Sequence, residues 1–354
     1  MIIRRLTILF IAVLLIGGAI LYLETIKVKP MTKITNRLNL NTEGKVRAPE
    51  LVNPAAYINS SGITIDELKG KKVVLVDFWT YSCINCQRTI PYLKDWYAKY
   101  KDQGLEIIGV HTPEFAFEKK YDNVRREVER WGIDYPVVLD NDYATWQAYA
   151  NRYWPHKYLI DKDGYIVYDH IGEGGYEDTE KVIVRLLSDL NNDEVVAVSS
   201  AVEEQNVEHR RIQTPEIYFG AQRNQWLGNA EPGQVGEVEL VAPAVPEPNK
   251  FYLVGKWFIG PESVVAREAG AKILIRYTAK DVYMVAGAEP TVNAKIYLNG
   301  DAEIESSGQD VINGKVNFGD ERLYKLIQGD DYGSHVLEIE VEDSGLEVFT
   351  FTFG

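Results

Sequence analysis

The feature that most constrains the fold is an apolar run that leads directly into two cysteines and then into a helical pattern. The run KKVVLVDFW contains a β-type stretch from Val73 to Phe78, and YSCINC follows it. In the next segment, RTIPYLKDWYAKYKDQG, apolar residues recur at three- and four-residue spacing until Gly104. This spacing is typical of an amphipathic helix with one buried face. The sequence therefore predicts a strand–loop–helix unit with both cysteines at its junction.

Further strands and helices alternate after this unit. LEIIGVHT predicts a second buried strand, and a charged helix is expected from about Phe115 to Trp131. YPVVLD predicts a strand, ATWQAYANRY a short helix, and TEKVIVRLLSDL a closing helix. In YLIDKDGYIVYDHIG, Lys162 to Gly164 supply the turn of a hairpin. Strands alternating with helices indicate a layered α/β domain.

The two cysteines are the residues best suited to chemistry. Cys83 and Cys86 are the only cysteines of the chain and lie one helical turn apart. At a helix N-terminus, free backbone N–H groups and the helix dipole favour a thiolate, which is the attacking species in thiol–disulfide exchange. Cys86 is near enough to attack the resulting mixed disulfide. The pair therefore predicts a two-step redox cycle that needs neither a bound cofactor nor a metal.

Three other interpretations of the pair stay open from the residues alone. It could be an inert structural disulfide. It could also be half of a zinc site, although no second ligand pair at the usual spacing occurs among the histidines; the candidates are His111, His156, His170 and His209. A peroxidatic cysteine is a third interpretation, because Thr80-x-x-Cys83 matches part of the peroxiredoxin signature. Val76 stands where that signature needs proline.

The surroundings of the pair resemble thioredoxin. Asp77 lies six residues before Cys83, and Pro91 lies five residues after Cys86. In that family a buried carboxylate assists deprotonation of the second cysteine, so the resemblance implies this role for Asp77. A strand-end carboxylate that caps a turn is the alternative.

The same resemblance implies a cis-proline beside the cysteines. Tyr153-Trp154-Pro155 precedes the strand YLID, so we expect a cis Trp154–Pro155 bond, against the alternative of an ordinary trans proline. Pro155 would help to dock the backbone of a client protein. Trp154 and Tyr81 are the side chains expected to contact that client.

Longer segments resemble the DipZ proteins, which belong to the TlpA-like group of extracytoplasmic thiol–disulfide oxidoreductases. The segments are FWTYSCINCQRTIPYL, GVHTPEFAFEK and the stretch from YPVVLD to GYEDTE, within residues 45–190. The resemblance implies an insertion in the thioredoxin core between Gly109 and Asp140. Glu114, in the HTPEF motif, is a candidate second carboxylate near the active site, or else a solvated surface residue.

The N-terminus departs from the DipZ pattern. DipZ proteins begin with a polytopic CcdA-like membrane domain, whereas this chain has one apolar run, Leu6–Leu23, after Arg4 and Arg5. Residues 1–29 are therefore expected to be a single-pass membrane anchor, and residues 30–60 a tether. A cleaved signal peptide or the opposite orientation are alternatives. The resemblance then implies that electrons come from a separate CcdA-like membrane protein.

A second domain is expected after a polar linker. Residues 61–190 form the predicted thioredoxin-like domain, 191–213 the linker, and 214–354 an all-β, jelly-roll-like sandwich with short alternating segments. This last part resembles the carbohydrate-binding-module-like domain of DipZ proteins. Candidate contacts to a glycan are the aromatic residues Trp226, Trp257, Tyr252 and Tyr332, which could equally be core. Asp301, Asp330 and Asp331 could bind calcium or be solvated turn acids, and protein docking is as plausible as sugar binding.

Composition narrows the function. The 354 residues carry 52 acidic and 38 basic side chains, a net charge of −14, which disfavours nucleic acid as a partner. Ile84 and Asn85, between the cysteines, include no histidine or cation of the kind that stabilises the thiolate in strong oxidants. The sequence thus favours a membrane-tethered, extracytoplasmic oxidoreductase that reduces protein disulfides. A disulfide-forming oxidase or isomerase, or a cell-envelope receptor that uses the β-domain, are the alternatives.

Overall fold

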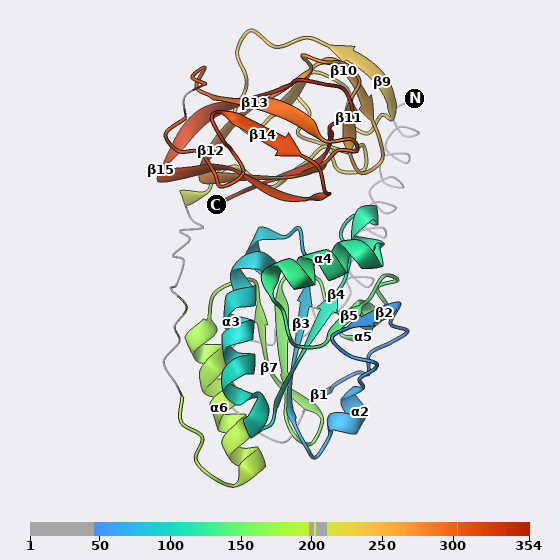
Figure 1. Cartoon of the computed structure of the whole chain (residues 1–354), viewed down its shortest axis with the longest axis vertical. Coiled ribbons are helices and arrows are strands. Elements are labelled where there is room, and N and C mark those ends of the chain that lie inside the picture. The colour runs from blue at the N-terminus through green and yellow to red at the C-terminus, as the bar shows by residue number, and fades with distance from the viewer. Residues whose placement is uncertain (1–45, 198–201, 203–210, 303) are drawn as a thin grey trace, which may run out of the picture. The chain divides into compact units, whose positions relative to one another are not determined.

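Two hydrogen-bonded sheets organise the computed structural model, which describes residues 46–197, 202, 211–302 and 304–354 (Figure 1). The expected membrane anchor, residues 1–29, lies outside these described residues. Within them, no helix has both the length and the apolar character that a membrane crossing needs.

The first sheet has seven strands in the order β1-β7-β6-β3-β4-β5-β2. Its central strands β3, β4 and β5 run parallel, and the outer pairings are antiparallel. The strand bounds are β1 Val46–Arg47, β2 Ala56–Ile58, β3 Val73–Trp79, β4 Leu105–His111, β5 Val137–Leu139, β6 His156–Ile160 and β7 Tyr165–Ile171. The hairpin predicted around Lys162–Gly164 is the β6–β7 pair.

Helices cover this sheet. Their bounds are α2 Ile65–Leu68, α3 Ile84–Tyr100, η1 Lys101–Gln103, η2 Ala116–Lys119, α4 Tyr121–Trp131, α5 Ala144–Ala148 and α6 Tyr176–Asn191. Gly104 follows η1 with φ +107°, the left-handed conformation that glycine adopts without steric cost, so the expected helix stop is confirmed. The single charged helix expected from about Phe115 is instead the short turn η2 followed by α4.

Strand β3 is buried on both faces, which explains its continuous apolar sequence. Val73, Leu75 and Trp79 join a core with residues of α3 and α6, including Cys86. The alternate residues Val74, Val76 and Phe78 join a second core on the other face. Because side chains alternate along a strand, Asp77 lies on the same face as Val73, Leu75 and Trp79, toward α3.

The predicted tether includes residues that belong to the sheet. Strand β1 pairs with β7, and β2 pairs with β5, so this part of the 30–60 segment is folded. Strands of two or three residues are too short to show a periodic pattern, which is why the sequence did not reveal them.

The second sheet contains nine strands in the order β14-β13-β15-β12-β10-β11-β16-β8, with β9 paired to β10. The bounds are β8 Ile217–Tyr218, β9 Gly236–Leu240, β10 Phe251–Ile259, β11 Val264–Ala266, β12 Lys272–Gly287, β13 Val292–Leu298, β14 Lys315–Phe318, β15 Arg322–Val341 and β16 Glu347–Phe353. The β-rich domain is thus as expected, but its hydrogen bonds join the strands into one continuous sheet. The reason is that β12 and β15 are long and bulged, and β12 pairs with β10, β15 and β16.

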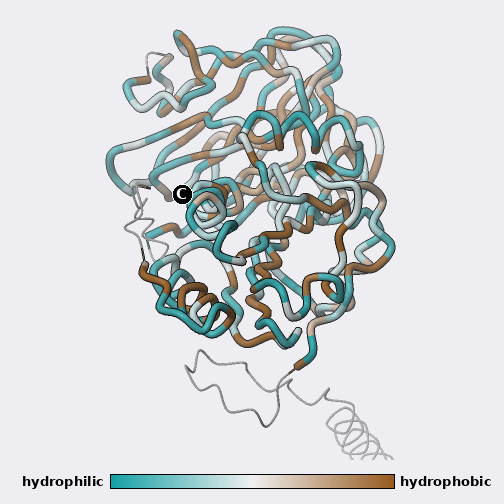
Figure 2. The backbone as a smooth tube through the Cα atoms, turned by 60° about the horizontal axis from the view of Figure 1, so that its bottom comes forward, coloured by the Kyte–Doolittle hydropathy of each residue, from teal (hydrophilic) through white to brown (hydrophobic). Residues whose placement is uncertain are grey.

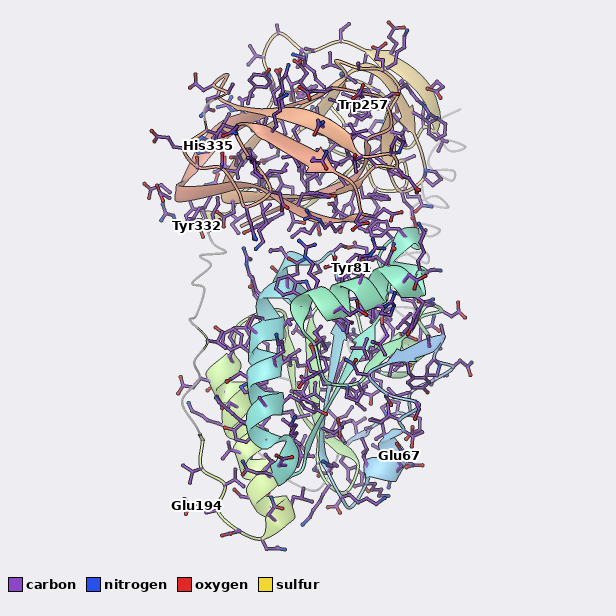
Figure 3. The ribbon with its side chains drawn as sticks, viewed as in Figure 1. Glu67, Tyr81, Glu194, Trp257, Tyr332 and His335 are labelled. Atoms are coloured by element: carbon purple, nitrogen blue, oxygen red, sulfur yellow. The ribbon has the colours of Figure 1, made fainter. Side chains whose placement is uncertain are left out.

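One apolar core lies inside the β-rich domain. It includes Ile217 of β8 and Val316 of β14, from opposite ends of the strand order, so the sheet curves around a common interior. In Figure 2, hydrophobic and hydrophilic residues alternate over short stretches, as strands with one buried face require. Trp257 lies among these strands (Figure 3) and is buried, as is Tyr252. Neither can be an exposed glycan contact, which corrects that expectation for both.

The tryptophans of the β-rich domain give a matched test of this core. Trp257→Ala should lower the free energy of unfolding by about 3–5 kcal/mol, because it removes a fully buried indole and leaves a cavity. Trp226, which is only half-buried at the core's edge, is the control, and Trp226→Ala should cost less than half as much. Urea unfolding followed by tyrosine and tryptophan fluorescence measures both. Equal costs would contradict the assigned core.

Candidate active site

Both cysteines lie at the N-terminus of α3. Cys83 is its N-cap residue, half-buried, and its Sγ accepts a hydrogen bond from the Cys86 backbone N–H at 3.4 Å. Cys86 is buried, and both side chains are free thiols in this structure. The thiol nearer to solvent is therefore the one at the helix N-terminus, where a negative charge is favoured.

Cys86 is held as a neutral thiol by its surroundings. Burial, its contact with Cys83 and the nearby Asp77 carboxylate together raise the pKa of Cys86 well above its usual value. A thiol of this kind becomes a nucleophile only when a neighbouring base removes its proton.

Asp77 is the buried carboxylate whose charge acts on Cys86. Burial raises the pKa of Asp77 to about 7, and the positive charge of Lys157 opposes that rise. Its Oδ1 atom is buried without a hydrogen-bond partner among the described residues. A carboxylate with a pKa near neutrality can both accept and release a proton under physiological conditions.

Lys157 is the residue that the sequence analysis missed. It lies opposite Asp77 in the antiparallel β3–β6 pair and is fully buried. Its Nζ donates to the Gly172 carbonyl at 2.9 Å and lies 5.7 Å from the centre of the Tyr176 ring. Burial lowers the pKa of Lys157, whereas the charge of Asp77 raises it. A lysine inside the buried strand HKYLI was the available signal, since lysine is almost never buried unless it is paired.

The proline loop lies beside the site. The Trp154–Pro155 bond is cis, as predicted. The Trp154 indole N–H donates to the Thr112 carbonyl at 3.0 Å, and the Pro155 carbonyl accepts from the Gly172 N–H at 2.8 Å. The neighbouring side chain of Tyr153 is 52% exposed.

Tyr81 is not placed as expected for a client contact. It is 1% exposed, stacks on His111, and donates its hydroxyl hydrogen to the Glu321 carbonyl at 3.2 Å. Figure 3 shows Tyr81 close to the start of α3. Tyr81 does lie in the turn before Cys83, but tertiary packing buries its side chain.

In the longer segment GVHTPEFAFEK, the fully buried carboxylate is Glu118, whereas Glu114 binds residues of the β-rich domain. Glu114 Oε1 accepts from Arg223 at 2.7 Å and from the Tyr218 hydroxyl at 2.8 Å, both in the β-rich domain. Glu118 is fully buried and accepts from the hydroxyls of Thr80 at 2.5 Å and Ser82 at 2.6 Å. Burial raises the pKa of Glu118, and these hydrogen bonds oppose that rise.

The described histidines among the candidate zinc ligands do not form a metal site. His111 is buried, and desolvation lowers its pKa to about 3, so it stays neutral. His156 lies within hydrogen-bond distance of Asn151 and Asp169. His209 lies outside the described residues. Over the described ranges, no three or more His, Cys, Asp or Glu side chains are grouped as a metal site.

Comparisons with known proteins identify families and relatives for both domains. A family model described as Redoxin matches residues 43–187, and one described as Thioredoxin like C-terminal domain matches residues 214–354. Protein DipZ of Mycobacterium bovis is 38% identical over 310 residues, which are 87% of this chain and 43% of DipZ. The chain thus spans less than half the length of that relative.

Other similar proteins match a smaller share of the chain. Thiol-disulfide oxidoreductase YkuV of Bacillus subtilis is 30% identical over 141 residues, which are 40% of this chain and 94% of YkuV. The solution structure of a thioredoxin-like protein in the oxidized form is 29% identical, with a TM-score of 0.38, and covers 41% of this chain and 97% of its own. The expected resemblance to DipZ proteins is confirmed by the match to Protein DipZ and by the two family models.

The Asp77–Lys157 pair can be tested by titration. Lys157→Met should raise the pKa of Asp77 further above about 7, because burial then acts without an opposing positive charge. Carbon-13 NMR of the Asp77 carboxyl as a function of pH measures this pKa. Lys71→Met, which alters an exposed lysine, is the control and should leave the titration unchanged. An unaltered Asp77 midpoint in Lys157→Met would show that the two charges do not interact.

Proposed function

Since the chain belongs to the DipZ-like branch of the thioredoxin family, we propose that it is a protein thiol–disulfide oxidoreductase and that it reduces disulfides of client proteins through Cys83 and Cys86. The observation that carries the proposal is the arrangement at the α3 N-terminus. A half-buried thiol caps the helix, a buried thiol lies one turn later, and a carboxylate whose pKa is about 7 lies on the same face.

The proposed reaction has two exchange steps. The Cys83 thiolate attacks one sulfur of the client disulfide, forms a mixed disulfide and expels the other client sulfur as a thiolate. Asp77 then accepts the Cys86 proton, and the Cys86 thiolate attacks Cys83 Sγ. The second client sulfur leaves, the client gains two electrons, and the pair ends as a Cys83–Cys86 disulfide. The positive charge of Lys157 would keep Asp77 ionised often enough to act as the base.

The neighbourhood of Cys83 supports reduction over oxidation. Ile84 and Asn85 provide no positive charge or histidine to stabilise a thiolate at Cys83. Burial and the Asp77 carboxylate raise the pKa of Cys86, so Cys86 gains none of the thiolate stabilisation that makes a pair a strong oxidant. An oxidase or isomerase is the second candidate, and the potential measured below separates the two.

Client proteins would dock on the apolar surface beside the proline loop. Tyr153 is 52% exposed and Ile171 is 51% exposed, and both flank Pro155, since Ile171 pairs with His156. Trp154 is half-buried and is held by Thr112, so it would form the rigid floor of that surface.

The location of the protein is part of the proposal. The apolar run Leu6–Leu23 supports a single-pass anchor that places residues 61–354 outside the cytoplasm. A CcdA-like membrane protein would then return electrons to the Cys83–Cys86 disulfide. At the β-rich domain, a glycan or protein of the cell envelope would bind, with Trp226 and Tyr332 as the remaining candidate aromatic contacts.

Trapping of clients tests the order of attack. Cys86→Ser should accumulate mixed disulfides between Cys83 and client proteins, because no second thiol is left to release them. Non-reducing gel electrophoresis of cell extracts, repeated after dithiothreitol, measures the adducts. Cys83→Ser is the matched control and should trap none while losing all turnover. Adducts on Cys86 instead of Cys83 would reverse the assigned roles.

The direction of the reaction follows from the reduction potential of the pair. Equilibration with dithiothreitol should give a value near that of thioredoxin, about −270 mV, for a reductase. A value near about −120 mV would make the protein a disulfide-forming oxidant. A pair with no reversible couple would contradict the enzymatic proposal altogether.

A further inference from the structure

Glu118 is a buried carboxylate that the reaction above does not use. It lies in η2, within the segment between β4 and α4, and none of its surface is exposed to solvent. Burying a carboxyl group is costly unless it is well hydrogen-bonded, so its partners indicate what it does.

The partners of Glu118 lie on two different segments. Its Oε2 accepts from the backbone N–H groups of Glu114 at 2.6 Å and Phe115 at 3.0 Å. Its Oε1 accepts from the hydroxyls of Thr80 and Ser82 and, at 3.4 Å, from the Ser82 N–H. Capping of η2 explains the bonds to Glu114 and Phe115. It does not explain the three bonds to the turn that precedes Cys83.

That turn sets the position of the nucleophile. Ser82 is the residue immediately before Cys83, and the Cys83 N–H donates to the Thr80 carbonyl at 3.3 Å. Fixing the Thr80 and Ser82 hydroxyls therefore fixes the backbone that carries the Cys83 sulfur at the start of α3. Small displacements of a nucleophile can lower a rate by orders of magnitude.

The β-rich domain holds the segment that carries Glu118. Arg223 and the Tyr218 hydroxyl bind the Glu114 carboxylate, and Glu262 accepts from the Ala116 N–H at 3.0 Å. Phe349 packs against the ring of Phe117 at a centroid distance of 4.6 Å. Charged, polar and aromatic contacts thus all act on residues 114–117, next to Glu118 in the chain.

We propose that Glu118 is a positioning residue for Cys83, which it serves by holding the Thr80–Ser82 turn, and that the β-rich domain keeps the Glu118 segment in place. The inference rests on the proposed role of Cys83 as the nucleophile. It assigns the β-rich domain a part in the redox site that does not depend on any ligand of its own.

The direct test replaces the carboxylate in the full chain by its neutral isostere. Glu118→Gln should lower the rate at which reduced Cys83 reacts with iodoacetamide and with 5,5′-dithiobis(2-nitrobenzoate) at least fivefold. The matched control is Glu127→Gln, a buried glutamate on α4 that contacts Arg130 and not the turn, and it should stay within twofold of the parent. Near-UV circular dichroism verifies that both variants are folded. Parent-like rates in folded Glu118→Gln would overturn the proposal.

A double-mutant cycle separates positioning from a general loss of stability. Ser82→Ala removes one hydrogen-bond partner of Glu118. It should lower the rate at which Cys83 reacts with these reagents at least threefold. The double variant Ser82→Ala with Glu118→Gln should react little more slowly than Glu118→Gln alone, because both changes break the same contact. If the two single effects on the rate multiply in the double variant, Glu118 acts by another route.

Two further variants apply if Glu118→Gln fails to fold. Thr80→Val and Ser82→Ala keep the carboxylate, and parent-like rates in both would overturn the proposal.

The contribution of the β-rich domain has its own variant. Arg223→Met should lower the alkylation rate of Cys83 two- to threefold. The control is Arg267→Met, which alters an exposed arginine of the same domain that pairs with Glu237, and it should leave the rate unchanged. Equal rates in these two variants would refute this half of the proposal. Alkylation needs no client, so a parent protein that reduces no protein disulfide would end the proposed function, while the alkylation rates would still decide the role of Glu118.

Discussion

The structure depends above all on the burial of a carboxyl group beside a buried thiol. Asp77 lies in the central strand of a sheet covered on both faces, where water cannot solvate its charge. That desolvation raises the pKa of Asp77 to about 7 and helps to keep Cys86 a neutral thiol. One buried cation, Lys157, lies opposite Asp77 in the β3–β6 pair, and its positive charge partly offsets the cost of burying the Asp77 charge.

The two buried carboxylates near the cysteines, Asp77 and Glu118, differ in their hydrogen bonding and so suit different proposed roles. Asp77 is suited to move a proton, because one of its oxygens has no hydrogen-bond partner in the described structure and its pKa lies near neutrality. Glu118 accepts five hydrogen bonds, which suits it to hold a backbone turn. The distinction lies in the number of donors around each group and not in its residue type.

The sequence was informative where contacts are local. The strand before Cys83, the helix after it, the stop at Gly104 and the β6–β7 hairpin all depend on neighbours within a few residues, and each was predicted correctly. Errors arose where distant segments meet. Tyr81 was expected at the surface, but Glu321, 240 residues later, covers it. Glu114 was expected to be either a second carboxylate near the active site or a solvated surface residue, and the structure adds a partner that neither expectation included, Arg223 of the β-rich domain.

The sequence by itself located the candidate redox pair, since two cysteines one helical turn apart, with Asp77 six residues earlier, form a local pattern that needs no tertiary information. Only the tertiary structure showed which charged groups lie close to those cysteines or to the residues that surround them. Lys157 reaches Asp77 through strand pairing across 80 residues of chain, and Glu118 reaches Thr80 and Ser82 from a separate segment. The physical reason is that desolvation and hydrogen bonding depend on distance in space, which a sequence pattern records only for residues that are close along the chain.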